Sequence, residues 1–344
     1  MNHLRLVEPE LASIEALLRE LATQYSSAED ENFLKDVGLF AHEMPRRLRA
    51  FLNDFKRLEP PAGNCVISGY AVNEAKIGRT PTHWKLRPAF SPTVEEEMYL
   101  LLLGSLLGDA LGWSTQQDGH LIHDVIPIQG HEHEQLGSSS EELLTWHNED
   151  AFHPYRCDYL GMMCLRNPDE VGTMLASMTG VQLDNAVTRV LFESRFTIRP
   201  DESHMEKNGS DLRKDSDEDR SSLEAAYRQI NQMNSNPEKL AVLYGDPRSP
   251  YVRIDPYFMD SLDDDNEGQA ALNALNAAIE GKIFDLVLQP GDCVFIDNHR
   301  TVHGRRPFKA KYDGNDRWLK RINVTRDLQK SRGSRHSCTS RIIY

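Results

Sequence analysis

The chain has 344 residues, of which 39% are hydrophobic and 27% charged, and this describes a globular protein large enough to fold without disulfide bonds. Its formal net charge of −14 argues against nucleic-acid binding, because nucleic-acid-binding proteins present a basic surface. The longest apolar run, residues 98–107, is too short to cross a bilayer, so no membrane association is expected.

The first part of the chain, residues 1–60, predicts a helical region. Apolar residues recur at helical spacing over residues 9–25 and again over 28–57, which predicts two amphipathic helices. Pro60 and Pro61 then end the pattern. These helices could form the face of a homo-oligomer, but packing on the core is the more common use of such a stripe.

The next elements are a short strand over residues 64–72 and a helix over 93–113. The helix is apolar on nearly all sides and is therefore expected to be buried. Apolar runs bounded by turn residues predict the remaining strands. They cover residues 119–128, 158–167, 171–178, 239–246, 249–258, 284–297 and 317–328.

Two further helices are predicted at residues 185–196 and 267–281. Between them, the highly charged stretch 201–222 predicts a mobile excursion that could act as a lid. The final residues, 331–344, are basic and rich in serine and predict a loose tail.

This order of elements predicts the fold class. Helices followed by many short strands indicate a mainly β protein with flanking helices, built on a β-sandwich or jelly roll. We expect a single domain, 1–344, with the jelly-roll core within 61–330. The sequence contains neither a glycine-rich phosphate loop nor a strand–helix alternation, so it does not indicate a Rossmann fold.

The cysteines indicate a reducing environment. There are five, an odd number, and no two are spaced as CxxC, which favours reduced thiols over disulfides or a zinc ribbon. The first residues resemble no secretory signal. Both features predict a cytoplasmic protein.

Three residues carry the predicted chemistry. His147 and Glu149 lie two positions apart, so in an extended segment they point to the same face. Much later, a Pro-Gly-Asp turn launches an apolar strand and His303 follows it, with His299 as a competing ligand in the same run. Two imidazoles and one carboxylate form the facial triad of non-haem Fe(II) oxygenases, which leaves coordination positions open.

An arginine could complete this site. Arg321 lies on the predicted strand 317–328 and could form a bidentate pair with the distal carboxylate of 2-oxoglutarate, with Arg326 as the fallback. A zinc hydrolase is a weaker alternative, because no nucleophile elbow or general base accompanies the ligands. The other alternative is a non-catalytic jelly-roll binding protein. In that case the presence of His147, Glu149, His303 and Arg321 at these spacings would be a coincidence.

Three segments together resemble a known family. Residues 146–168, 291–305 and 318–328 are similar to the clavaminate synthase-like 2-oxoglutarate oxygenases, and within them to the free arginine and lysine hydroxylases. The resemblance covers roughly residues 60–330. It implies a double-stranded β-helix (jelly-roll) core and hydroxylation of an unactivated side-chain carbon of a free basic amino acid.

The resemblance also implies the ligands of the cofactor and co-substrates. Fe(II) would be bound by His147, Glu149 and His303. Arg321 would anchor 2-oxoglutarate, with Thr173 assisting, and O2 would be the second co-substrate. An enzyme that acts on a carrier-bound amino acid is an alternative on the same fold.

On the substrate side, the resemblance implies four residues. Gln116 or Gln117 would bind the backbone of the amino acid, and Asp201 and Ser203 would close over it. Asp255 would grip the cationic end of the side chain.

One departure from the family bears on the substrate. Arginine hydroxylases of this group have a second acid two positions after the first, where this chain has Tyr257. One carboxylate and a tyrosine hydroxyl could satisfy the compact ammonium of lysine, whereas the broad guanidinium suits two carboxylates. The prediction is therefore L-lysine, with L-arginine as the alternative, hydroxylated at C4 in preference to C3.

Overall fold

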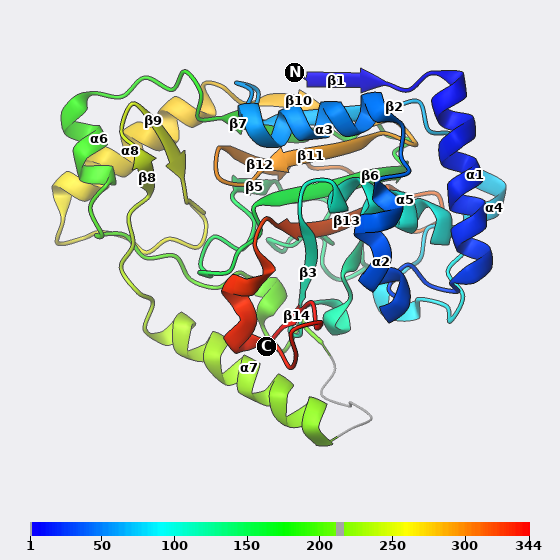
Figure 1. The fold of residues 1–344 in the computed structure, drawn as a ribbon. Coiled ribbons are helices and arrows are strands. Elements are labelled where there is room, and N and C mark those ends of the chain that lie inside the picture. The colour runs from blue at the N-terminus through cyan, green and yellow to red at the C-terminus, as the bar shows by residue number, and fades with distance from the viewer. Residues whose placement is uncertain (1, 211–216) are drawn as a thin grey trace.

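The computed structural model describes residues 2–210 and 217–344, whose strands form one large and two smaller sheets (Figure 1). The large sheet has the order β1-β2-β11-β6-β13-β3-β14, and β4 also pairs with β13. Its strands are β1 (Asn2–Arg5), β2 (Asn64–Ser68), β3 (Asp109–Trp113), β4 (Ile122–Val125), β6 (Tyr159–Arg166), β11 (Cys293–Asp297), β13 (Trp318–Thr325) and β14 (Ile342–Ile343).

The second sheet has the order β10-β7-β12-β5 and faces the first. Its strands are β5 (Leu144–His147), β7 (Thr173–Ser177), β10 (Phe284–Leu286) and β12 (Thr301–Arg305). Apolar side chains from both sheets, such as Val66, Leu160, Leu175 and Val294, form a common core between them. The predicted class, a mainly β protein with flanking helices around a jelly-roll core, is confirmed.

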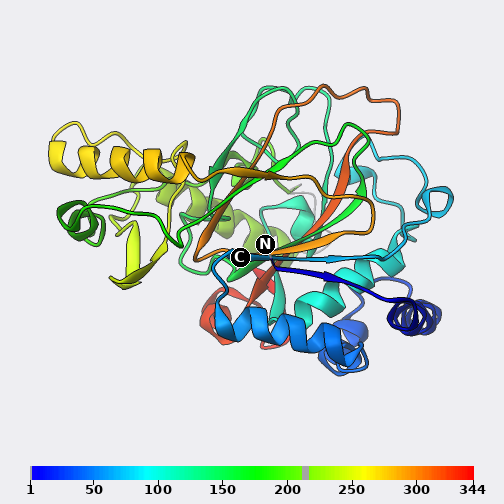
Figure 2. The same cartoon turned by 90° about the horizontal axis from the view of Figure 1, so that it is seen from above.

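Helices cover the outer sides of the two sheets. They are α1 (Glu8–Gln24), α2 (Glu31–Ala41), α3 (Arg46–Leu58), α4 (Glu74–Ile77), α5 (Val94–Ser105), α6 (Asn185–Leu191), α7 (Asp217–Ser235) and α8 (Asn266–Glu280). Figure 2 shows α1, α2, α3 and α5 on one side of the large sheet. Next to α6 and α8, β8 (Leu243–Asp246) and β9 (Ser249–Val252) form a hairpin.

Three of the predicted helices were too long. The helix predicted over 185–196 ends at Leu191. The helix predicted over 28–57 is interrupted, because α3 starts anew after Pro45, whose ring cannot continue a helix. The helix predicted over 93–113 ends at Ser105, and its last residues form β3. Gly108 permits this change of direction, since a Cβ there would lie 2.1 Å from the backbone oxygen of Thr325.

Three other segments also differ from the prediction. Residues 2–5 form the unpredicted strand β1, which pairs in parallel with β2. Part of the predicted mobile excursion, 211–216, lies outside the described residues, and from Asp217 the chain forms the helix α7. The predicted loose tail is ordered instead, because β14 pairs in parallel with β3 and buries Ile343.

The expectation of reduced thiols agrees with the structure. All five cysteines are free, and all except Cys338 are buried. Among the described residues, none of the helices combines the length and apolarity that a membrane crossing requires.

Candidate active site

Strand pairing brings the two predicted histidine ligands together. In the antiparallel pair β5–β12, His303 lies directly opposite His147. Residues directly opposite each other project on the same face of a sheet, and the two ring centroids are 4.5 Å apart. Two residues distant in sequence are therefore neighbours because of the strand register.

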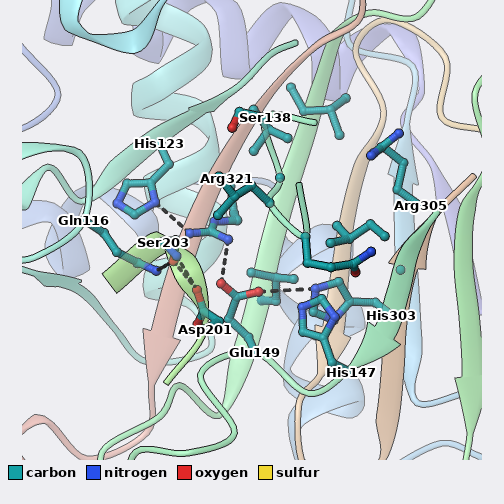
Figure 3. A pocket seen from close by; sticks show the side chains of 18 of the residues that line it. Gln116, His123, Ser138, His147, Glu149, Asp201, Ser203, His303, Arg305 and Arg321 are labelled. Carbon is teal, nitrogen blue, oxygen red and sulfur yellow. Dashed lines mark hydrogen bonds and ion pairs between the residues drawn. The ribbon is translucent and has the colours of Figure 1, made fainter. Parts of the chain in front are cut away.

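Glu149 completes the cluster from the segment that follows β5. Its Oε2 lies 3.2 Å from Nε2 of His303. One donor atom from each of the three residues lies within 4.8 Å of the other two (Figure 3). The structure therefore brings His147, Glu149 and His303 to one point, as the spacing predicted.

Two asparagines hold the backbone of Glu149 in place. The Asn298 side chain accepts a hydrogen bond from the Glu149 N–H and donates one to the Glu149 carbonyl, at 2.8 and 3.0 Å. Asn148 turns the other way and donates to the carbonyls of Asn298 and Thr301. The sequence offered no signal for this clamp, which immobilises the carboxylate before any metal binds.

The cluster is electrostatically prepared to bind a cation. Burial alone would raise the pKa of Glu149, but Arg321 and His303 outweigh it and hold that pKa well below its usual range, so the carboxylate is ionised. Burial, followed by the charge of His147, lowers the pKa of His303 and favours the neutral imidazole. The His147 Nδ1–H donates to the Thr145 carbonyl at 2.7 Å and leaves Nε2 free as a ligand.

These donors fit a catalytic metal such as Fe(II). Two imidazoles and one carboxylate form an open three-ligand set, whereas structural sites use four protein ligands. His299, the competing ligand, is engaged elsewhere, because its Nε2 lies 2.7 Å from Oδ1 of Asp158. Arg326 also pairs with Asp158 and does not line the pocket.

Arg321 lies directly beside the cluster. Its Nη1 is 2.5 Å from Oε1 of Glu149, and its Nη2 is 2.7 Å from Nδ1 of His123. His123 donates from Nε2 to the His120 carbonyl, so Nδ1 is the nitrogen that accepts from the guanidinium. The sequence did not indicate His123, which is fully buried and positions Arg321.

A second guanidinium, on Arg317, also faces the pocket. Arg317 directly precedes β13, and Arg321 lies four residues further along within it. In an extended run, residues four apart lie on the same face and about 13 Å from each other. Arg317 is buried, and within the described part of the chain its Nε has no partner and its one hydrogen bond is a long one of 3.4 Å to the hydroxyl of Thr173. Among the described residues no carboxylate pairs with it, and burial lowers its pKa to about 10.

Three of the predicted substrate residues meet on one wall of the pocket. The Gln116 side-chain amide donates to the hydroxyl of Ser203 at 2.5 Å, and the Ser203 N–H donates to the Asp201 carboxylate at 2.9 Å (Figure 3). The side-chain carbonyl of Gln116 is buried and has no partner among the described residues. Gln117, by contrast, uses both ends of its amide on the backbone of Asp124.

The other predicted substrate residues lie close by. Asp255 was expected within a strand but lies in the turn after β9, where its carboxylate accepts hydrogen bonds from two backbone amides. It is buried, no lysine or arginine of the described residues pairs with it, and burial raises its pKa to about 6. Tyr257 is 56% exposed at the rim of the same pocket.

One cavity joins all these groups. It lies between the two sheets and is lined by the three candidate ligands, by both arginines and by the substrate residues. Besides the metal ligands, its lining includes the cation Arg317, with which no carboxylate of the described residues pairs, and the acidic residues Asp201 and Asp255. Such a cavity can hold a dianion and a cationic amino acid at the same time.

Comparison with known proteins agrees with this chemistry. Residues 90–323 match the family described as taurine catabolism dioxygenase TauD, TfdA family. The chain is 43% identical to the enduracididine beta-hydroxylase of Streptomyces hygroscopicus over 100% of both chains. It is 44% identical to the L-ornithine/L-arginine 3-hydroxylase of Catenulispora acidiphila, again over 100% of both.

A crystal structure of the non-haem iron oxygenase OrfP in complex with Fe, succinate and (3S)-hydroxy-L-Arg has the same fold. It matches with a TM-score of 0.94 and 41% identity over 100% of both chains. The L-lysine 3-hydroxylase of Catenulispora acidiphila is only 27% identical, over 92% of this chain and 82% of its own. The preference for lysine over arginine is therefore not supported, and the arginine alternative fits better.

Proposed function

Because the chain belongs to the TauD, TfdA family of dioxygenases, we propose that it hydroxylates free L-arginine at C3. Its reaction class is Fe(II)- and 2-oxoglutarate-dependent hydroxylation of a free amino acid. The observation that carries the finer proposal is full-length identity of 43% and 44% to hydroxylases named for the β-position of enduracididine and the 3-position of arginine.

Different residues of the cavity would bind the iron and 2-oxoglutarate. His147, Glu149 and His303 would hold the iron. With 2-oxoglutarate and O2, the bound iron supplies the oxidation that inserts oxygen into an unactivated C–H bond. The protein contributes fixed ligands, an aligned substrate and a cavity that excludes water.

For 2-oxoglutarate we assign the anchoring role to Arg317, assisted by Thr173, in place of Arg321. Arg321 is already paired with Glu149 at the metal, whereas Arg317 is a buried cation with no carboxylate partner among the described residues. A second buried cation, Arg305, lies nearby, but its guanidinium is committed to Ser139, Ser140 and Glu142. A dianionic co-substrate would neutralise this end of the cavity.

The amino acid has three charges, and the remaining groups match them. Arg321 would bind its carboxylate, since the Nε of that guanidinium has no hydrogen-bond partner among the residues that the structure describes. Asp201, Ser203 and Gln116 would bind the α-amino group. Asp255 would bind the cationic end of the side chain, where the ring of Tyr257 offers a planar guanidinium a stacking surface.

A substrate panel tests the function directly. Purified enzyme with Fe(II), 2-oxoglutarate and O2 is given free L-arginine, L-ornithine, L-lysine or an arginine thioester, and products are identified by mass and NMR. We expect free arginine to gain one oxygen at C3 with stoichiometric succinate. Turnover of lysine alone, or only of the thioester, would overturn the proposal, and no succinate with any amino acid would favour a binding protein.

The role of Asp255 predicts a pH dependence. Because its pKa is raised to about 6, the carboxylate is protonated below that pH and cannot pair with a guanidinium, which stays charged throughout. The KM for arginine should therefore rise as the pH falls through 6 and level off above about 7. Asp255→Asn should remove this dependence and raise KM about 30-fold or more at pH 7.5, without changing iron affinity.

The same substitution should stabilise the protein. Above pH 6 the folded state carries a buried carboxylate that the unfolded state ionises more easily, which costs about 3 kcal/mol. Thermal unfolding of Asp255→Asn should therefore occur at a higher temperature than that of the wild type. Asp246→Asn, in the exposed β8–β9 turn, is the control and should change neither KM nor its pH profile.

A further inference from the structure

A buried histidine connects the substrate wall to the metal-binding segment. His204 ends the short 3-10 helix η3 (Glu202–His204) and has no exposed surface. Its Nδ1 is 2.7 Å from the hydroxyl of Thr115, and its Nε2 is 3.0 Å from Oδ1 of Asp150. Asp150 directly follows Glu149, so one imidazole ring joins the segment that carries Asp201 to the segment that carries a metal ligand.

The partners of His204 are themselves held in place. The other oxygen of Asp150 accepts a hydrogen bond from the indole N–H of Trp113 at 2.7 Å. The backbone carbonyl of Thr115 accepts from the N–H of Ser210 at 3.1 Å, which ties down the far end of the same segment. Asp150, Asp201 and His204 also cluster closely enough for a metal. Their donor atoms, however, are engaged with each other and with Trp113 and Thr115, so a hydrogen-bond network fits better than a second metal site.

We propose that His204 is a positioning residue, which holds Asp201 and Ser203 in register with the metal so that the bound amino acid presents the correct carbon. The inference rests on the proposed function, in which Asp201 and Ser203 bind the α-amino group. Ser203 and Asp201 precede His204 by one and three residues, so a shift of the ring moves both polar groups. A misplacement of the substrate uncouples 2-oxoglutarate consumption from hydroxylation.

Two substitutions test this role. His204→Gln keeps a donor for Asp150 but loses the bond to Thr115, and Thr115→Val removes the hydroxyl while preserving the volume. We expect each to raise KM for the amino acid about tenfold, and to lower the ratio of hydroxylated product to succinate at least twofold. The KM for 2-oxoglutarate and the affinity for Fe(II) should stay at the wild-type values.

His153→Gln is the matched control. His153 is equally a buried histidine packed edge-on against Trp113, but it does not line the cavity. We expect it to lower the unfolding temperature without changing KM or the product-to-succinate ratio. If His204→Gln does not fold, Thr115→Val decides the question alone.

The outcome separates this inference from the proposed function. Both KM and the product ratio are measured with whichever free amino acid the wild-type enzyme hydroxylates, so failure of arginine as substrate leaves the test intact. Variants with lower stability but wild-type KM and wild-type product ratio would make His204 merely structural and overturn the inference.

Discussion

Replacing His303 with alanine is expected to abolish Fe(II) binding and to lower hydroxylation by more than about a thousandfold. His303 supplies one of three converging donors, and the two that remain cannot hold the metal against water. The neighbouring Glu149 stays ionised through Arg321, so the loss reflects the missing ligand rather than a change in the carboxylate. Anaerobic calorimetric titration with Fe(II) and a succinate assay measure both effects.

His299→Ala provides the control within the same run of sequence. His299 lies four residues before His303 but is bonded to Asp158, away from the cavity. We expect this variant to bind Fe(II) as the wild type does, with some loss of stability because a buried hydrogen bond is broken. If His299→Ala lost the metal and His303→Ala kept it, the ligand assignment would be wrong.

Replacing Arg317 with methionine is expected to raise the KM for 2-oxoglutarate about a hundredfold, with a small effect on the KM for the amino acid. The reason is that a buried, otherwise unpaired guanidinium loses its ion pair with the distal carboxylate. Arg321→Met, four residues further along the chain, is the matched variant and should show the reverse pattern. Steady-state kinetics with each substrate varied in turn distinguish the two arginines.

Stability gives an independent readout of the same assignment. Burial lowers the pKa of Arg317 to about 10, so at neutral pH the charge destabilises the ligand-free protein by about 3 kcal/mol. Arg317→Met should therefore unfold at a higher temperature than the wild type when 2-oxoglutarate is absent. Added 2-oxoglutarate should stabilise the wild type but not the variant. Equal stabilisation of both proteins would return the anchoring role to Arg321.

Much of the fold could be predicted because local patterns decided it. The apolar runs of β6 and β7, bounded by turn residues, marked buried strands to within two residues of their observed ends. Where prediction failed, a distant contact decided the structure. Residues 109–113 continue an apolar helical run but form a strand, because β13 offers an edge on which they pair. The C-terminal tail likewise becomes a strand only because β3 lies beside it.

In the candidate site, too, local patterns could be predicted from the sequence and distant contacts could not. The HxE spacing and the later histidine predicted a cluster that the structure assembles, since any extended segment places residues two apart on one face. The two arginines of the predicted strand 317–328 could not be ranked from sequence. Arg317 and Arg321 are four residues apart, so in an extended segment both point to the same face. Only their partners in the folded protein, Thr173 for Arg317 and Glu149 for Arg321, distinguish their roles.

The sequence by itself determined the chemistry available to this protein: two imidazoles, a carboxylate, basic residues on one strand, and acids suited to a cationic amino acid. The tertiary structure decided which of these groups meet. The register of β5 against β12 brings His147 opposite His303. The packing of residues 201–210 on the end of β3 buries His204 against Asp150. Side-chain periodicity is a local property, whereas the partner that a buried charge finds depends on strands that fold together from distant parts of the chain.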